Sequence, residues 1–167
     1  MTFQAPLRVR TMGDADFHVL DVPPSVEQKL PHERVLVTVN GGLTWHAPLL
    51  PLGDGRGTYL VINVERRRQL RIAVGERVTV VLEPDDSPYG MPVPDEWRAL
   101  LAEDAELRTR FEALSPGKQR RLLYTVGKPR TEATRLRKAV GAAAYLHEVG
   151  SAGFSYQGLL AALKRNR

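Results

Sequence analysis

The sequence predicts an α+β protein in which a small closed six-stranded β-barrel precedes a C-terminal bundle of short helices. Three observations support this fold class. Hydrophobic residues alternate with polar ones up to residue 83, which is typical of half-buried strands. Four prolines follow within residues 84–94, where neither a helix nor a central strand can form. Beyond them the hydrophobic spacing changes to a helical period. We therefore expect a barrel domain at 1–83, a proline-rich linker at 84–94 and a basic helical segment at 95–167.

The N-terminal part contains six short runs of strand character, separated by tight turns rather than by long helices. Asn40-Gly41-Gly42 is typical of a hairpin turn. Closing such short antiparallel strands into a barrel removes the exposed sheet edges. The expected strands are Phe3–Val9, Phe17–Val22, Val35–Val39, Leu43–Ala47, Tyr59–Val64 and Arg77–Glu83, with short helices at Ser25–Leu30 and Glu65–Arg71.

Polar capping residues mark the start of each helix that we expect after the linker. Their side chains can accept hydrogen bonds from the free N–H groups of a first helical turn. They are Asp95, Asp104, Ser115, Thr131 and Ser155. The longest helix starts at Thr131 and ends at Gly150. Its inner stripe is expected to contain Leu136, Val140, Ala143 and Ala144.

Composition and charge narrow the class of protein. The 167 residues include no cysteine, which excludes disulfides and thiolate catalysis and fits a reducing cytoplasm. We expect no secretory signal and no membrane partner, because no long apolar run is present. The net charge of +5 arises after residue 90, where 14 Lys and Arg accompany 8 Asp and Glu, against 10 and 11 before it. This asymmetry predicts an acidic partner, either an acidic protein surface or nucleic acid; a solvated arginine-rich surface is the alternative. The oligomeric state stays open.

Two ordered sets of residues resemble a known pair of bacterial domains. The N-terminal set runs from the alternating valines before Asn40-Gly41 through Tyr59–Ile62 and Leu70–Val80 to Glu83-Pro84-Asp85. It resembles a bacterial barrel domain of unknown function that often precedes a YdeI/OmpD-associated helical segment. The residues that resemble this second segment are Pro92-Val93-Pro94, Leu100, Phe111–Pro116 and Arg120-Arg121.

The later pattern of that helical segment is Ala-Lys-x-x-Glu-Thr-Arg-x-Arg-Arg. Here Pro129 replaces the alanine and Ala133 the glutamate, so a role that depends on the glutamate does not carry over. The label "bacteriocin protection" that accompanies such segments implies a stress or resistance setting in bacteria and no mechanism. The residues that match are Arg130, in place of the lysine, and Thr134, Arg135, Arg137 and Lys138.

Basic residues gather between residues 120 and 138. Arginines at such spacing can bind successive phosphates, or the carboxylates of a protein partner, through bidentate hydrogen bonds. Alternatively they flank an apolar stripe and pair with Glu112, Glu132 or Glu148. Tyr124 and Tyr145 could stack on bases; the alternative is that they are buried or lie at the rim of the core. The predicted partner-binding residues are Arg120, Arg121, Lys128, Arg130, Arg135, Arg137 and Lys138.

A second basic patch is expected on the barrel. Its order of strand, short arginine-bearing helix, Gly75-Glu76 turn and strand is similar to the double-split barrel of AbrB-type transcription factors. The DNA-contacting arginines of those barrels lie on the barrel surface, so the resemblance implies a nucleic-acid surface here. An exposed helical turn balanced by Glu65 and Glu76 is the alternative. The patch contains Arg66, Arg67, Arg68 and Arg71.

No arrangement of residues predicts catalysis. The four histidines lack metal-ligand spacing, and Gly53-x-Gly55-x-Gly57 is typical of a hairpin turn rather than a phosphate loop. Asp85 and Asp86 lie in the linker without a basic companion. We therefore predict no enzyme, no cofactor and no metal. The leading hypothesis is a non-catalytic bacterial cytoplasmic protein whose barrel is a scaffold for a basic binding face, in a stress or resistance setting. The alternatives are a nucleic-acid-binding protein of the AbrB-like type, and a small-molecule-binding barrel or enzyme with a pocket near Trp45.

Overall fold

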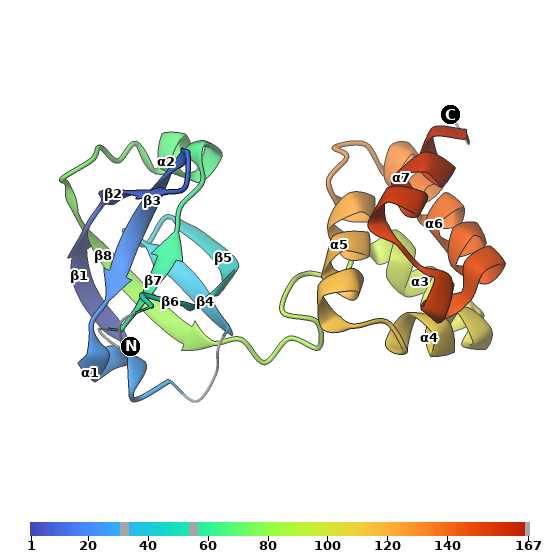
Figure 1. Ribbon diagram of the computed structural model, residues 1–167, viewed down its shortest axis with the longest axis horizontal. Coiled ribbons are helices and arrows are strands. Elements are labelled where there is room, and N and C mark those ends of the chain that lie inside the picture. Colours follow the sequence, from blue (N-terminus) through green and yellow to red (C-terminus); the bar gives the residue numbers. More distant parts are fainter. Residues whose placement is uncertain (31–33, 54–56, 166–167) are drawn as a thin grey trace. The chain divides into compact units, whose positions relative to one another are not determined.

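The computed structural model describes residues 1–30, 34–53 and 57–165, and the chain divides into two compact units, Met1–Asp86 and Ser87–Arg167. Figure 1 shows strands gathered in the first unit and helices in the second. The α+β class therefore holds. The division falls within the proline-rich stretch at 84–94. Each unit has its own hydrophobic core.

The first unit consists of two four-stranded antiparallel sheets, so the expected closed six-stranded barrel, and with it the AbrB-like double-split form, is wrong. One sheet has the order β1-β8-β4-β5 and the other β2-β3-β7-β6 (Figure 1). Within the described residues the strands are β1 (Thr2–Pro6), β2 (Arg8–Met12), β3 (Ala15–Val22), β4 (Arg34–Val39), β5 (Leu43–Pro48), β6 (Leu50–Pro51), β7 (Thr58–Val61) and β8 (Arg77–Pro84).

The break between the sheets lies at the end of β1, inside a run that alternates without interruption. Pro6 has no N–H group for the sheet ladder, and β1 ends there. Leu7 then bonds across to the turn before β8, donating to the Glu76 carbonyl at 2.9 Å and accepting from Gly75 N–H at 2.8 Å. The chain continues as β2, which pairs with β3 and not with β8. One expected strand is thus two strands in two sheets.

Side chains from both sheets form the core of the first unit. Val37 of β4 lies opposite Leu82 of β8 and Trp45 of β5 in the strand register. Together with Leu20 of β3 and Leu60 of β7 they are buried in one cluster. Two short helices, α1 (Pro24–Glu27) and α2 (Val64–Leu70), complete the unit.

Within the described residues five helices form the second unit, and the longest of these, α6 (Glu132–Gly153), packs against the other four. Trp97 of α3 and Phe111 of α4 are fully buried, with ring centroids 5.4 Å apart. Helical dihedral angles in α6 are interrupted at Gly150, where φ is 66°, the residue at which the sequence predicts that the helix ends. The helices are α3 (Asp95–Glu103), α4 (Ala105–Glu112), α5 (Pro116–Gly127), α6 (Glu132–Gly153) and α7 (Tyr156–Arg165).

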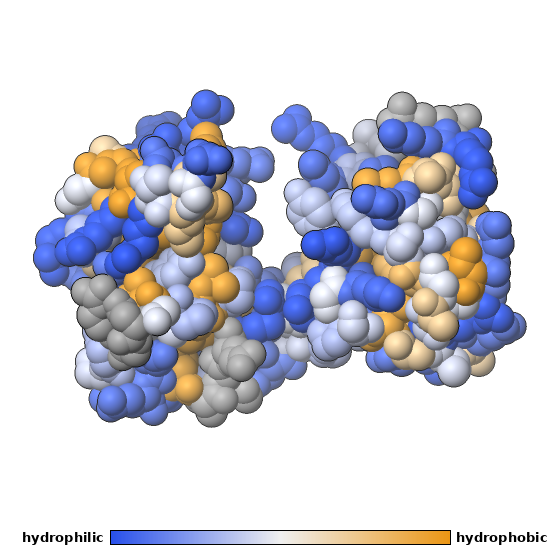
Figure 2. Space-filling model, in the orientation of Figure 1, coloured by the Kyte–Doolittle hydropathy of each residue, from blue (hydrophilic) through white to orange (hydrophobic). Residues whose placement is uncertain are grey.

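The inner stripe expected for α6 is only partly correct. Ala143 is buried, but Leu136 and Val140 are 50% and 51% exposed. The helix instead buries a neighbouring face that includes Ala139 and Ala142, because small side chains let the surrounding helices approach closely. Figure 2 shows hydrophobic patches among the hydrophilic residues on the visible face of each unit. Among the described residues, no helix combines the length and apolarity needed to cross a bilayer.

Candidate functional site

Two pockets of the second unit adjoin the short connection between α5 and α6, and Lys128 lines both of them. The first, which we call the basic pocket, has a volume of about 450 Å³. Four basic side chains and no acidic one line it. Its residues are Lys128, Pro129, Arg130, Thr134, Arg137, Lys138 and Leu163.

The basic pocket contains four of the seven predicted partner-binding residues. Arg130 and Arg137 are exposed, and among the described residues neither forms an ion pair. Lys138 is half-buried, and its Nζ donates to the carbonyl of Thr125 at 3.3 Å. Lys128 places its Nζ 5.6 Å from the ring centroid of Tyr124. Their positive charges therefore face one volume without a carboxylate in its wall.

Arg135, a fifth predicted residue, is held inside the unit. Its Nε donates to Glu96 Oε1 at 2.7 Å, and its Nη1 donates to the carbonyl of Arg130 at 3.1 Å. The Glu96 side chain is only 9% exposed, against 28% for Arg135. This contact joins the start of α6 to α3. Its geometry is that of a structural ion pair, and little of the guanidinium is left to bind a partner.

The last two predicted residues lie on α5 and line neither pocket described above. The guanidinium of Arg121 lies 5.3 Å from the ring centroid of Tyr156 on α7. Arg120 is half-buried. Four of the predicted residues thus line the basic pocket. Arg135 lines the second pocket while paired with Glu96, and Arg120 and Arg121 line neither.

The patch predicted on the first unit is also divided. Arg67 Nη1 donates to His18 Nε2 at 2.7 Å, which holds α2 against β3. The guanidinium of Arg66 lies 4.9 Å from the ring centroid of Trp45. Arg68 and Arg71 are exposed, and Arg71 ends α2 in the left-handed conformation with φ 54°. Two of the four arginines therefore contact aromatic or imidazole rings of their own unit.

The second pocket, which we call the apolar pocket, was not predicted from the sequence. It also has a volume of about 450 Å³, and it lies between the segment before α3 and the end of α5. Tyr124 is 54% exposed at its wall. The sequence signal for this pocket is the proline-rich stretch, because its prolines keep the segment before α3 from forming a helix or a central strand. The residues that shape it are Met91, Val93, Pro94, Leu123, Tyr124 and Lys128.

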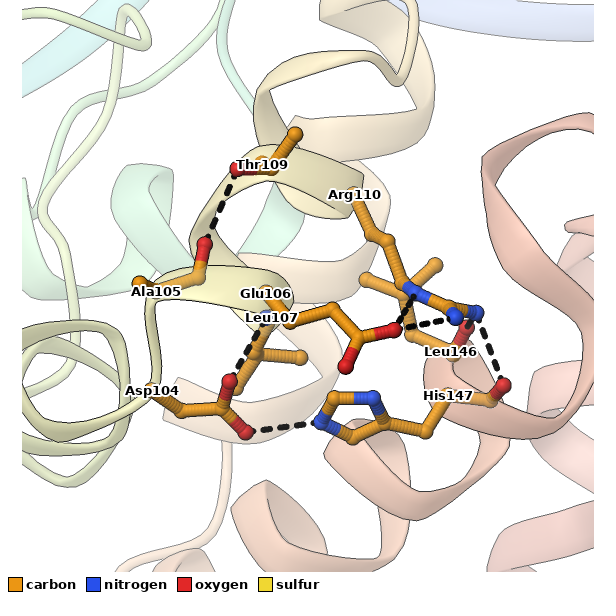
Figure 3. Close-up of polar contacts among 8 residues, drawn as sticks. All are labelled: Asp104, Ala105, Glu106, Leu107, Thr109, Arg110, Leu146 and His147. Carbon is orange, nitrogen blue, oxygen red and sulfur yellow. Dashed lines mark hydrogen bonds and ion pairs between the residues drawn. The ribbon is translucent and has the colours of Figure 1, made fainter.

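A polar network fixes α6 against the start of α4 (Figure 3). Asp104 accepts from Leu107 N–H at 2.8 Å and lies 2.7 Å from His147 Nε2. These two hydrogen bonds hold the pKa of the Asp104 carboxyl below its ordinary value. Arg110 pairs with Glu106 and donates to the carbonyl of His147 at 2.8 Å. These contacts join α4 to α6 within the second unit, so the network has a structural role.

Two other sequence motifs, the Asp85-Asp86 pair and the glycine-rich turn at 53–57, lie in the first unit. Asp85 does have a basic companion, because His46 Nδ1 lies 2.9 Å from its Oδ2, so the prediction of an isolated carboxylate was wrong. The sequence did not indicate this partner, because His46 lies on β5, 39 residues before Asp85. The glycine-rich turn at 53–57 includes residues 54–56, which lie outside the described residues.

Two family models match the chain, one for each unit. Residues 3–82 match the model described as a domain of unknown function (DUF1905). Residues 90–148 match the model described as bacteriocin-protection, YdeI or OmpD-associated. The two matches follow each other along the chain in the predicted order. The resemblance stated from the residues is thereby confirmed. The residues that line both pockets lie within the segment that matches the YdeI/OmpD-associated model, apart from Leu163 of the basic pocket. No curated protein matches the chain.

Proposed function

We propose that the chain is a non-catalytic binding protein whose YdeI/OmpD-associated domain holds an anionic group of its partner in the basic pocket. The setting is the stress or resistance response of a bacterium, and the compartment is the cytoplasm. The family description supports this setting, and the absence of cysteine supports this compartment. The first unit then serves as a scaffold.

One observation carries the proposal: four basic side chains line a single pocket that has no acidic residue in its wall. Like charges that face one volume raise the local potential and attract an anion, particularly where protein walls reduce the dielectric. Arg137 and Arg130 offer guanidinium groups suited to phosphate or carboxylate oxygens. Lys138 is held by the Thr125 carbonyl, so part of the charge is already positioned.

Calorimetric titration of the full chain with inorganic phosphate tests the proposal. We expect saturable binding that weakens with added salt, and a loss of at least about tenfold in affinity for Arg137→Gln, since charge-assisted hydrogen bonds contribute about 1.5–3 kcal/mol each. Arg121→Gln is the matched control, because it removes the same charge from α5 outside the pocket and should change little. Equal effects of the two variants, or no binding at low salt, would overturn the proposal.

Nucleic acid is the second candidate partner. The exposed Tyr124 ring beside Lys128 favours it, because bases stack on aromatic side chains while cations neutralise phosphates. Fluorescent single-stranded DNA and RNA titrated over a salt series distinguish it from a smaller anion. An affinity that falls steeply with salt concentration indicates several released counterions and hence an extended contact. A shallow slope, like that of inorganic phosphate, argues against nucleic acid.

A further inference from the structure

The apolar pocket and the basic pocket share the Lys128 side chain as part of their walls. Each has a volume of about 450 Å³, within the range of small-molecule sites. Both are built from residues of the second unit. The shared residue places the two pockets next to each other at the connection between α5 and α6.

The wall of the apolar pocket is preformed. Pro92 and Pro94 restrict the backbone of the segment that lines one side. On the other side Gly127 lets α5 approach that segment, because a Cβ atom at Gly127 would lie 3.0 Å from Pro94 Cγ. Leu123 and Val93 complete an apolar surface. Little reorganisation is needed for an apolar group to enter.

Tyr124 gives this pocket a preference for planar groups. Its ring is 54% exposed at the pocket wall, and Lys128 Nζ lies 5.6 Å from the ring centroid. An exposed aromatic ring of this kind favours contact with another ring, which stacks or packs edge to face. A cation over the same ring also suits a ligand that carries a negative charge beside its aromatic part.

Charge sorts the two ends of such a ligand between the pockets. The apolar pocket contains two carboxylates, but each is paired with an arginine: Asp95 with Arg98 at 2.6 Å and Glu96 with Arg135 at 2.7 Å. The basic pocket has four cations with no carboxylate in its wall. An anionic end is therefore drawn to the basic pocket, which leaves the uncharged end against Tyr124.

We propose that the two pockets together bind an aromatic phosphate monoester, with its ring against Tyr124 and its phosphate among Arg130, Arg137 and Lys138. Phosphate fits four cations better than a single carboxylate does, because it carries more charge and more acceptor oxygens. Lys128 contacts the ligand where the two pockets adjoin. This proposal rests on the proposed anion site and adds the chemical class of the ligand.

Calorimetric titration of the full chain with four probes tests this assignment. The probes are inorganic phosphate, phenyl phosphate, adenosine monophosphate and adenosine. We expect at least one aromatic phosphate to bind about tenfold or more tightly than inorganic phosphate, as one ring stacked on an aromatic side chain contributes. Adenosine, which lacks the phosphate, should bind most weakly.

Two variants separate the contributions of the pockets. Tyr124→Ala should abolish the advantage of the aromatic phosphates over inorganic phosphate, whereas Tyr124→Phe should keep the advantage. Arg137→Gln should weaken every phosphate probe by a similar factor. Tryptophan fluorescence of each variant checks that it is folded.

The outcomes distinguish the two proposals. If inorganic phosphate binds and the aromatic phosphates bind no more tightly, the aromatic site is refuted while the anion site stands. The same conclusion follows if Tyr124→Ala weakens all phosphates alike. If no phosphate probe binds the wild-type chain, both proposals fail.

Discussion

Replacing Arg135 tests how the α5–α6 connection is held together. Arg135 donates to Glu96, whose side chain is 9% exposed, and to the carbonyl of Arg130. Arg135→Met keeps much of the side-chain length and removes the charge. It leaves a buried carboxylate without its donor, and the second oxygen of Glu96, Oε2, already has no hydrogen-bond partner among the described residues.

The expected loss of stability follows from this burial. Removing one partner of a buried ion pair costs about 3–5 kcal/mol, because the remaining charge is uncompensated. Arg135 is 28% exposed, so water can partly replace it, and we expect about 3 kcal/mol. For a unit of this size each kcal/mol shifts the midpoint of thermal unfolding by roughly 4–8 °C, which gives roughly 12–24 °C in total.

The chain offers its own probe for the assay. Its two tryptophans are divided between the units, with Trp45 in the first and the fully buried Trp97 in the second. In a Trp45→Phe background, fluorescence reports unfolding of the second unit alone. Arg137→Met is the matched control on the same helix, and because Arg137 is exposed without an ion pair among the described residues we expect a change within about 0.5 kcal/mol.

A double-mutant cycle completes the test. The double variant Glu96→Leu/Arg135→Met lacks both charges, so it should be far more stable than the single variant Arg135→Met. The reasoning is refuted if Arg135→Met is as stable as Arg137→Met. It is also refuted if the double variant is no more stable than Arg135→Met.

Three further predictions concern the second unit. Gly158→Ala should destabilise it by about 1–3 kcal/mol in denaturant unfolding, because the new Cβ would lie 2.8 Å from Tyr145 Cζ; Tyr145→Phe should recover part of the loss, and a gain in stability would contradict the clash. The pKa of Asp104 is lowered by its bonds to Leu107 N–H and His147, so the stability that it contributes is present above its ordinary pKa of 3.8 and is lost as pH falls below that value. Acid unfolding of Asp104→Asn should accordingly depend less on pH in that range, and an unchanged profile would refute this. Partial burial, with a hydrogen bond to a glutamate, raises the pKa of Tyr89 to about 12, so an absorbance titration should show one tyrosine that ionises near that pH and that disappears in Tyr89→Phe.

Local pattern was enough to predict where most strands and helices lie, since alternation and capping depend on neighbouring residues. The sheet arrangement was not accessible in this way. The alternating run through Leu7 looks like one strand. Only the strands with which its two halves pair show that β1 ends at Pro6 and that β2 belongs to the other sheet. On α6, periodicity placed Leu136 and Val140 inside because they are large and apolar. The structure buries an adjacent face that carries alanines, where close approach of helices matters more than side-chain size.

Local sequence pattern was also insufficient to predict the arrangement of the candidate site. The basic cluster could be predicted from the sequence, but the role of each arginine depends on an acceptor far along the chain. Glu96 is 39 residues from Arg135, and neither position indicates the other by spacing. The apolar pocket required the segment before α3 to lie beside the end of α5, which is a tertiary arrangement. Tyr124 is 54% exposed and therefore not buried, and its stacking on bases stays a prediction.

Some of the positively charged side chains of the helical unit have a structural role, which a count of charges does not reveal. Short helices leave carbonyl groups without partners at their C-terminal ends, and cationic donors satisfy them favourably. Arg108 donates to the carbonyl of Leu101 near the end of α3, Lys138 to that of Thr125 near the end of α5, and Arg110 to that of His147 before the interruption of α6. Three of the basic side chains of this unit are therefore already engaged in contacts within it. Partner binding has to be sought in the cations that remain after these contacts are assigned. Arg130 and Arg137 are the two arginines that line the basic pocket, and neither has an internal ion pair among the described residues.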